Sequence, residues 1–270
     1  MRPTEHVLDM FAVPGDTEPV PGGHGHSVRA GDLVLSPGRD VSSVDVLAPV
    51  LARLAADLDT RPGRDHRDLR IAMPVPARDG SWVVDGWAAT RYEPGVVPLT
   101  DLAVTRAVGA VLHAELAVRV PVPRLPHRQD RWARAERVAF GETPVTTDAL
   151  GPDGGELLRA LVAHGDDSPL GPDQLVHGDL AGNVLLDPRG APLVIDVSPY
   201  RRPVLWAEAL LVLDSVLWHG ADPAVMQEWA TGAAGVAMAR AAAFRLLSDR
   251  PADVGAYTRA LGPLLARLRT

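Results

Sequence analysis

The chain has 270 residues and a mass of 28.7 kDa, and 46% of its residues are hydrophobic, so it is long and apolar enough to bury a substantial core. It contains no cysteine, which excludes disulfides and thiolate chemistry, and its 27 basic residues are all arginine, which excludes every site built on a lysine. The net charge of −7 argues against binding to the phosphate backbone of nucleic acids.

The sequence predicts neither a membrane span nor a signal peptide. Residues 233–244 come closest to an apolar span, but Arg240 interrupts them, and they fall short of the roughly 18–20 residues that cross a bilayer. The first ten residues lack a basic segment followed by an apolar one. Together with the absence of cysteine, these features predict a cytoplasmic protein with no membrane partner.

The first hundred residues predict short strands separated by glycine and proline. A strand at 18–20 leads into a glycine-rich loop at 21–27. Residues 28–29 and 33–35 are expected to pair as a hairpin across the turn at 30–32, because a short Gly-Asp turn between apolar runs is a hairpin signal.

A helix is expected within 44–58, where Leu47, Leu51 and Leu58 recur at helical spacing. Proline is disfavoured inside a helix and tolerated in its first turn, so Pro49 predicts that the helix begins there.

Two further strands are predicted at 81–84 and 87–92. The dipeptide Asp85-Gly86 separates them and is a strong hairpin signal. Residues 93–95 then break the pattern, and we place a lobe boundary between residues 93 and 94.

Most of the remaining chain is predicted to be helical. Helices are expected from Thr100, as N-cap, to about Leu116, over 131–140 and 155–164, and after Pro203 with breaks near 220–223 and 250–251.

One β-hairpin is expected within this helical part. The short apolar runs Val184–Leu186 and Leu193–Ile195 are separated by the turn sequence at 187–190. Asn183 precedes the first strand and Asp196 follows the second, so the hairpin brings both residues to the same end.

These oxygen-bearing side chains suit a divalent cation. Mg²⁺ is often held by one or two protein oxygens together with phosphate oxygens and water. Asp179, four residues before Asn183, is placed to accept a proton from an attacking hydroxyl. Metal ligands with a nearby carboxylate are the parts that phosphoryl transfer requires.

The segments HGDLAGNVL at 177–185 and VIDVSPY at 194–200 resemble the protein-kinase-like superfamily in its aminoglycoside and choline phosphotransferase branch. The resemblance implies a two-lobed α+β fold. A small antiparallel sheet lobe over 1–93 would bind nucleotide, and a mainly helical lobe over 94–270 would carry the catalytic residues and the acceptor. The segments PGGHGHSVRAGDLVL, WVVDGWAATRYEPG and VSPYRRP also resemble an actinobacterial group within this branch.

The same resemblance implies roles for individual residues. Asp179 would be the catalytic base, and Asn183 and Asp196 would bind Mg²⁺. His177 would organise the loop rather than act as a base. The implied reaction moves the γ-phosphoryl group of ATP or GTP to a hydroxyl of a small molecule.

The nucleotide is expected against the sheet lobe. Glycines in the loop let backbone amides approach phosphate oxygens, and the backbone near the end of the last strand would bind the adenine. The residues expected to bind nucleotide are Gly22, Gly23, Gly25, Arg29, Ala89 and Arg91.

The sequence departs from the family pattern in two places. Three residues separate Asp179 from Asn183, where the branch usually has four, so the loop must be tighter. Ser36 stands where the superfamily has a phosphate-binding lysine, and the helix position that would carry its glutamate partner falls near Asp45. Arg29 or Arg39 is a candidate replacement for the missing cation.

Two interpretations stay open at this point. In one, the protein is an active phosphotransferase with a modified phosphate clamp. In the other, it is a pseudokinase that binds nucleotide or another small ligand without turnover. A metal hydrolase would need further ligands, and the histidines do not have ligand spacing. A serine hydrolase would need a G-x-S-x-G elbow, which the sequence lacks.

The acceptor is expected near residues that follow Asp196. Trp206 and Trp218 also fit an apolar helical pattern and are equally explained as core residues. Asp214 lies within that apolar stretch, so it must be paired with an arginine or serve a function. The full set of candidates is Tyr200, Arg201, Arg202, Trp206, Asp214, Trp218, His219 and Asp222.

Overall fold

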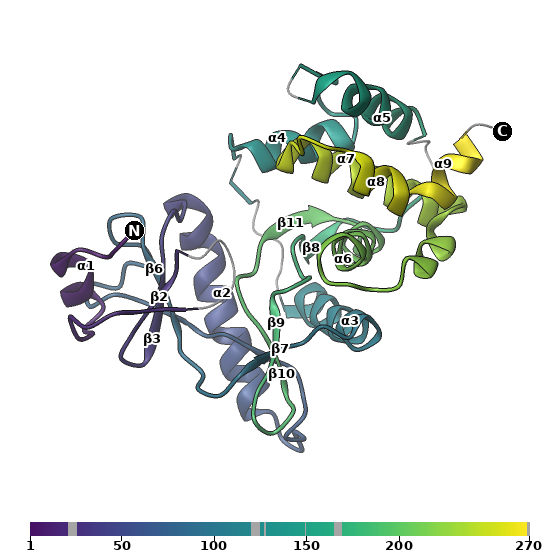
Figure 1. Ribbon diagram of the computed structural model, residues 1–270. Helices are drawn as coiled ribbons and strands as arrows, with labels where there is room; N and C mark the ends of the chain where they lie inside the picture. Colours follow the sequence, from purple (N-terminus) through teal and green to yellow (C-terminus); the bar gives the residue numbers. More distant parts are fainter. Residues whose placement is uncertain (21–25, 120–124, 127, 149, 165–168, 269–270) are drawn as a thin grey trace. The chain divides into compact units, whose positions relative to one another are not determined.

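The structure is a computed structural model of the whole chain (Figure 1). It describes residues 1–20, 26–119, 125–126, 128–148, 150–164 and 169–268. The chain divides into two compact units. The first comprises Met1–Leu99, Ala114–Pro126 and Gly182–Val197, and the second comprises Thr100–His113, His127–Ala181 and Ser198–Thr270.

The first unit contains an antiparallel five-stranded sheet with strand order β1-β2-β3-β6-β5. Its strands are β1 (Glu18–Pro19), β2 (Val28–Ala30), β3 (Leu33–Ser36), β5 (Pro74–Val75) and β6 (Ala88–Arg91). The predicted hairpin is confirmed, because Ala30 pairs with Leu33 and Val28 with Leu35 across a turn in which Gly31 has φ +57°.

The short helix α1 (Glu5–Met10) was not predicted from the sequence. Thr4 caps it by accepting a hydrogen bond of 3.3 Å from the N–H of Val7. Val7 and Phe11 pack into a small core with apolar side chains of the five-stranded sheet, including Leu35.

The helix α2 (Val41–Thr60) is longer than expected and packs against β4 (Arg70–Ile71) and β5. Asp40 caps its N-terminus through the N–H of Ser43 at 2.9 Å. The prediction that the helix begins at Pro49 is therefore wrong, since Pro49 lies inside it. Burial of the leucine face holds the helix together despite the cost of an interior proline, which is about 3 kcal/mol.

The Asp85-Gly86 turn forms as predicted, with φ +47° and +78°. The residues that flank this turn, Val84 and Trp87, form a single isolated β-bridge. The strand expected at 81–84 does not form. The preceding chain is held instead in a local turn, in which the carboxylate of Asp79 accepts hydrogen bonds from the N–H and the hydroxyl of Ser81. The next strand, β6, pairs with β3 and β5.

The predicted hairpin of β9 (Val184–Leu186) and β10 (Pro192–Val194) is confirmed. It forms a four-stranded sheet of order β4-β10-β9-β7 with β4 and with β7 (Val97–Pro98). Because both of these outer strands come from the N-terminal hundred residues, the hairpin belongs to the first compact unit. The sequence had placed it in the lobe over 94–270.

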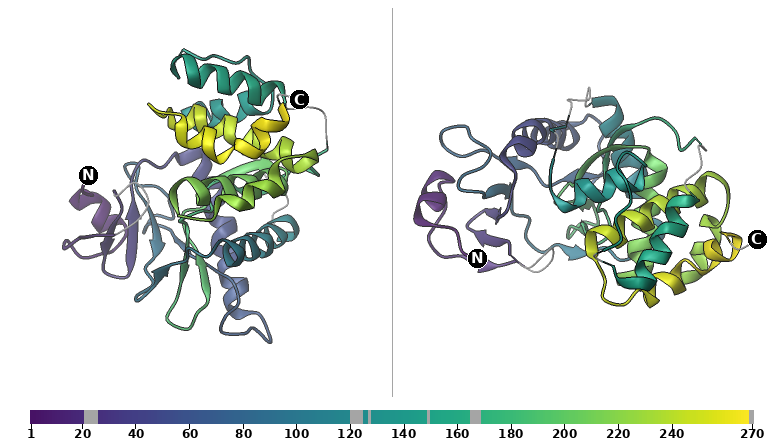
Figure 2. Two further views of the ribbon diagram at one scale, coloured as in Figure 1. Left: turned by 45° about the vertical axis from the view of Figure 1, so that its right-hand side comes forward. Right: turned by 90° about the horizontal axis from the view of Figure 1, so that it is seen from above.

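The second unit is mainly helical, with one strand pair, β8 (Gln174–His177) and β11 (Pro199–Arg202). Its helices include α4 (Arg131–Ala139), α5 (Gly151–Ala163), α6 (Val204–Trp218), η1 (Pro223–Trp229), α7 (Gly232–Asp249), α8 (Gly255–Ala260) and α9 (Gly262–Leu268). Figure 2 shows α7 lying between α5 and α6.

The helix α3 (Leu102–Arg119) begins in the second unit and continues into the first. It was predicted to be capped by Thr100. Asp101 takes that role, because its carboxylate accepts a hydrogen bond of 3.0 Å from the N–H of Val104.

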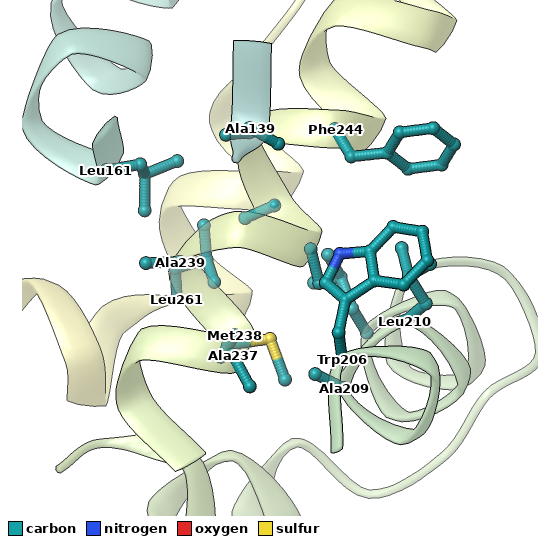
Figure 3. Close-up of a cluster of buried hydrophobic side chains, with 14 of the residues drawn as sticks. Ala139, Leu161, Trp206, Ala209, Leu210, Ala237, Met238, Ala239, Phe244 and Leu261 are labelled. Carbon is teal, nitrogen blue, oxygen red and sulfur yellow. The ribbon is translucent and has the colours of Figure 1, made fainter. Parts of the chain in front are cut away.

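The core of the second unit is centred on Trp206 of α6, which is completely buried (Figure 3). Its ring meets Phe244 of α7 edge to face at 5.5 Å, and meets Tyr200 and Phe140 in the same way. Trp206 is thus a core residue, and Trp218 is about half exposed. Among the described residues, no helix is both long and apolar enough to cross a bilayer.

Candidate functional site

The first unit contains a cavity of about 300 Å³ between its two sheets and α2. Most of its wall is aliphatic, with side chains from β3, α2, β4, β6 and the β9–β10 hairpin. These include Val34, Leu47, Ile71, Ala89, Leu185 and Leu193. An apolar pocket of this size with a few polar groups at one end is typical of a small-molecule site.

Arg39, Asn183 and Asp196 supply polar groups to the wall. The Asp85-Gly86 turn positions Arg39, because the N–H of Arg39 donates to the carbonyl of Gly86 at 3.0 Å. Asn183 is buried. Its backbone carbonyl accepts a hydrogen bond of 3.0 Å from the backbone N–H of Ile195, the residue before Asp196. The hairpin therefore brings Asn183 and Asp196 to the same end, as the sequence predicts.

Asp196 is held in an uncommon conformation. Its φ is +45°, in the left-handed region that side chains other than glycine seldom adopt, although aspartate tolerates it better than most. Its Oδ1 lies 2.6 Å from Nη1 of Arg39. Backbone strain of this kind is concentrated at functional sites.

Asn183 and Asp196 fit a divalent cation that is shared with a ligand. An amide oxygen and a carboxylate match the preference of Mg²⁺ for hard oxygen ligands. In the part of the chain that the structure describes, no group of three or more acidic or histidine side chains could hold a metal by itself. The donor set therefore fits an ion whose coordination is completed by phosphate oxygens and water.

The expected nucleotide-binding residues fall into three groups. Ala89 and Arg91 line the cavity. Arg29 does not; it stacks on Tyr92, with its guanidinium 4.3 Å from the ring centroid, and its Nε donates to the carbonyl of Gly31 at 3.0 Å. The predicted glycines Gly22, Gly23 and Gly25 lie outside the described residues.

The structure also places the two residues that were compared with the ion pair of the superfamily, Ser36 and Asp45. Ser36 ends β3 and lines the cavity, and its hydroxyl is 2.9 Å from the hydroxyl of Ser27. Asp45 lies inside α2 and is exposed. Of the two arginines considered as replacements, Arg39 is the one in the cavity wall.

In the second unit, His177 organises the loop that follows β8. It is completely buried, and its Nδ1 accepts hydrogen bonds from the N–H groups of Asp179 at 3.1 Å and Ser198 at 3.4 Å. The backbone N–H of His177 donates a hydrogen bond to Nε2 of His113 at 3.2 Å. Burial, together with the nearby His177, lowers the pKa of His113 to about 4, so His113 is neutral and can accept.

Gly178 allows this loop to pass close to β11. A Cβ atom at position 178 would lie 2.4 Å from Cδ2 of Tyr200, which is far inside van der Waals contact. The glycine of the HGD motif is therefore required by the close approach of backbone and aromatic ring.

Asp179 follows directly and makes an ion pair with Arg245 of α7. Nη2 of Arg245 donates to Oδ1 of Asp179 at 2.7 Å. The same guanidinium makes two hydrogen bonds to Asp214 of α6, from Nε at 2.9 Å and from Nη2. Arg245 was not among the predicted site residues, although its position as one of two arginines within a largely apolar helix was a signal.

Asp214 and Arg245 form a buried, charged pair. Burial raises the pKa of Asp214, and the guanidinium of Arg245 opposes that shift. The neighbouring carboxylates raise the pKa of Arg245. An arginine does not lose its proton in proteins, so Arg245 stays charged and faces the buried carboxyl group of Asp214. Asp214 is thus paired with an arginine, one of the two alternatives that the sequence left open.

Comparison with known proteins identifies the fold. No protein-family model matches the sequence, and no curated protein matches it. Solved structures match over almost the whole chain. The choline kinase LicA from Streptococcus pneumoniae has a TM-score of 0.53 and 14% identity, with 97% of each chain covered.

Two other solved structures are comparably similar. An aminoglycoside phosphotransferase from Alicyclobacillus acidocaldarius has a TM-score of 0.53 and 13% identity, covering 100% of this chain and 96% of its own. An amicoumacin kinase in complex with AMP-PNP and Ca²⁺ has a TM-score of 0.52 and 16% identity, covering 98% and 87%. At these identities the likeness establishes the fold. The predicted fold class is confirmed: the chain has the mixed α+β fold of the protein-kinase-like phosphotransferases.

Proposed function

We propose that this protein is a small-molecule phosphotransferase that moves the γ-phosphoryl group of ATP or GTP to a hydroxyl group, with Mg²⁺ as the divalent cation. The observation that carries the proposal is the end of the aliphatic cavity, where Arg39, Asn183 and a left-handed Asp196 provide one cation and two oxygen ligands. The shared fold with choline and aminoglycoside kinases supports it.

Each part of the site has a role in this proposal. The aliphatic wall would take the nucleotide base, and Arg39 would contact its phosphates in place of the absent lysine. Asn183 and Asp196 would hold Mg²⁺, which when bound neutralises charge on the phosphate oxygens.

Asp179 would orient the acceptor hydroxyl and take its proton. The acceptor oxygen forms a bond to the γ-phosphorus, the bond from that phosphorus to the β,γ-bridging oxygen breaks, and the nucleoside diphosphate leaves. Only three residues separate Asp179 from Asn183, so their Cα atoms cannot be more than about 14 Å apart. The short chain between them supports a shared role.

The experiment combines titration with turnover. Isothermal titration with ATP in Mg²⁺ and in EDTA measures binding, and an ATP-consumption assay over a panel of aminoglycosides, amino alcohols and sugars measures turnover. We expect binding that depends on Mg²⁺ and consumption that depends on one acceptor class. Asp179→Ala should abolish turnover and leave binding of Mg²⁺–ATP nearly unchanged. Full turnover in that variant would show that Asp179 is not the base.

A pseudokinase, which binds nucleotide or another small ligand without turnover, is the second candidate. Ser36 in the cavity wall favours it, because a serine cannot supply the phosphate-binding cation that the family resemblance implies at this position. Binding of Mg²⁺–ATP without consumption over the whole panel supports this candidate. If nucleotide does not bind at all, the phosphotransferase and a nucleotide-binding pseudokinase are both wrong.

A further inference from the structure

We infer that Arg245, anchored by the buried carboxylate of Asp214, is a positioning residue that holds Asp179 for the reaction; this inference rests on the proposed phosphotransferase function. The inference is based on a series of linked charged side chains, which we call the chain of charges. It runs from Asp214 in α6 through Arg245 in α7 to Asp179 in the loop after β8.

Burying the charged groups of Asp214 and Arg245 in the core costs free energy, because both lose their contact with water. Asp214 and Arg245 are 1% and 5% exposed, within two helices that are otherwise almost wholly apolar on their facing sides. Replacing a buried ion pair by apolar side chains is often neutral or stabilising, so stability alone does not explain why the pair is present.

The geometry offers an explanation. Asp214 takes two hydrogen bonds from Nε and Nη2, which fixes the plane of the guanidinium. With that plane fixed, Nη2 also reaches Oδ1 of Asp179 at 2.7 Å. Of the three side chains only Asp179 is substantially exposed, at 44%, so the chain of charges ends at the surface of the unit.

The surroundings of Arg245 reinforce this orientation. The ring centroids of Phe244 and Trp218 lie 5.3 and 5.7 Å from its guanidinium carbon. Asp249, in the same helix, accepts hydrogen bonds from the hydroxyls of Tyr257 at 2.9 Å and Ser248 at 3.0 Å. Asp249 thus has hydroxyl partners of its own, and Arg245 makes ion pairs with Asp214 and Asp179.

Held in this way, Asp179 keeps a defined carboxylate position. A carboxylate has about four lone-pair sites, so it can accept a hydrogen bond from a hydroxyl while Arg245 is bound to Oδ1. Without the guanidinium, the loop carboxylate would sample other rotamers, and the productive position would be populated less often.

The test is a kinetic comparison of full-length variants with the best acceptor from the panel. Arg245→Met should lower kcat by about 100-fold, the size of effect that misplacing a reacting group by an ångström produces. The KM for Mg²⁺–ATP should stay within about twofold, because Arg245 does not line the nucleotide cavity. The matched control is Arg240→Met, which removes an arginine from the same helix, where its guanidinium stacks on Phe140.

A conservative variant distinguishes positioning from a general structural effect. Arg245→Lys keeps a cation facing Asp179 and should recover part of the kcat that Arg245→Met loses. If Arg245→Met does not fold, the double variant Asp214→Leu with Arg245→Met removes both buried charges at once, and thermal unfolding shows whether it is folded. It should show the same loss of kcat.

The outcomes separate this inference from the proposed function. Wild-type kcat in folded Arg245→Met, or an Arg245→Lys variant no more active than Arg245→Met, overturns the inference and leaves the proposed phosphotransferase function standing. If the wild-type protein consumes no ATP with any acceptor of the panel, both the inference and the proposed phosphotransferase function are overturned.

Discussion

At the scale of single residues, Arg39 is the most informative side chain of the cavity. It is the cation beside Asp196, and it lies three residues after Ser36, the position at which the sequence resemblance implies a lysine. Arginine carries a delocalised charge on a flexible side chain and binds phosphate in a forked geometry, so it can supply the charge from a shifted backbone position.

We predict opposite effects of Arg39→Gln on two ligands. Affinity for Mg²⁺–ATP should fall about tenfold, which corresponds to ~1.4 kcal/mol, because a charge-assisted contact to phosphate is lost. Affinity for free Mn²⁺ should rise, because Asp196 loses its competing cation. Titration calorimetry and Mn²⁺ electron paramagnetic resonance measure the two changes.

The matched control for this prediction is Arg53→Gln, on an exposed position of α2. It should leave both affinities unchanged. If Arg39→Gln leaves nucleotide affinity unchanged, Arg39 is not the replacement for the lysine.

At the scale of elements, the pairing of β8 with β11 sets the position of the HGD loop. His177 pairs with Pro199 and Val176 with Tyr200, so the loop leaves the sheet beside the Tyr200 ring. That ring is fixed by edge-to-face contacts with Trp206 and Phe244, at 5.4 and 5.6 Å. Any side chain at position 178 must displace either the loop or this aromatic cluster.

Gly178→Ala is therefore expected to destabilise the protein by about 2 kcal/mol, in the range of overpacking in a rigid core. Chemical unfolding monitored by tryptophan fluorescence measures the change in unfolding free energy. Adding Tyr200→Leu should recover part of the loss by removing the ring edge that the new Cβ would meet at 2.4 Å.

Gly262→Ala at the start of α9 is the control for the glycine substitution itself. A Cβ there meets nothing within 4 Å, and the backbone is not left-handed. It should be neutral or slightly stabilising. Equal stability of Gly178→Ala and the wild type would mean that the close contact with Tyr200 is absent in solution.

At the scale of the whole molecule, the buried histidine pair links folding to pH. The pKa of His113 falls from 6.5 to about 4 on folding, because burial disfavours its charged form. Between these values the unfolded chain binds a proton that the folded chain does not. The contribution of the neutral His113 to stability is therefore fully present above pH 6.5 and is lost progressively as the pH falls toward 4.

We predict that protonation of His113 lowers the free energy of unfolding by up to about 3 kcal/mol between pH 6.5 and 4, because folding lowers the pKa of His113 from 6.5 to about 4. His113→Gln keeps an acceptor for the N–H of His177 and removes the titration. Urea unfolding at a series of pH values should show a shallower acid dependence in this variant than in the wild type.

His66→Gln is the reference for this comparison, because the His66 side chain is 56% exposed. Its acid dependence should match that of the wild type. An unchanged dependence in His113→Gln would show that His113 is not neutral in the folded state.

Local sequence signals predicted those parts of the fold in which neighbours along the chain determine the structure. The hairpin turn at Gly31, the Asp85-Gly86 turn and the β9–β10 hairpin all form, because each depends on a few residues with restricted backbone angles. The strands β4, β5 and β7 were not predicted. They have two residues each and are defined by distant partners rather than by their own pattern.

The site shows the same division. The sequence by itself determined which residues have the chemistry for the site, because HGD, Asn183 and Asp196 stand at fixed positions around a predictable hairpin. Only the tertiary structure decided that Arg39 rather than Arg29 faces the cavity, and that Arg245 meets Asp179 across 66 residues of chain. The physical reason is that turns depend on local backbone angles, whereas a buried charge takes its partner from whichever helix packs against it.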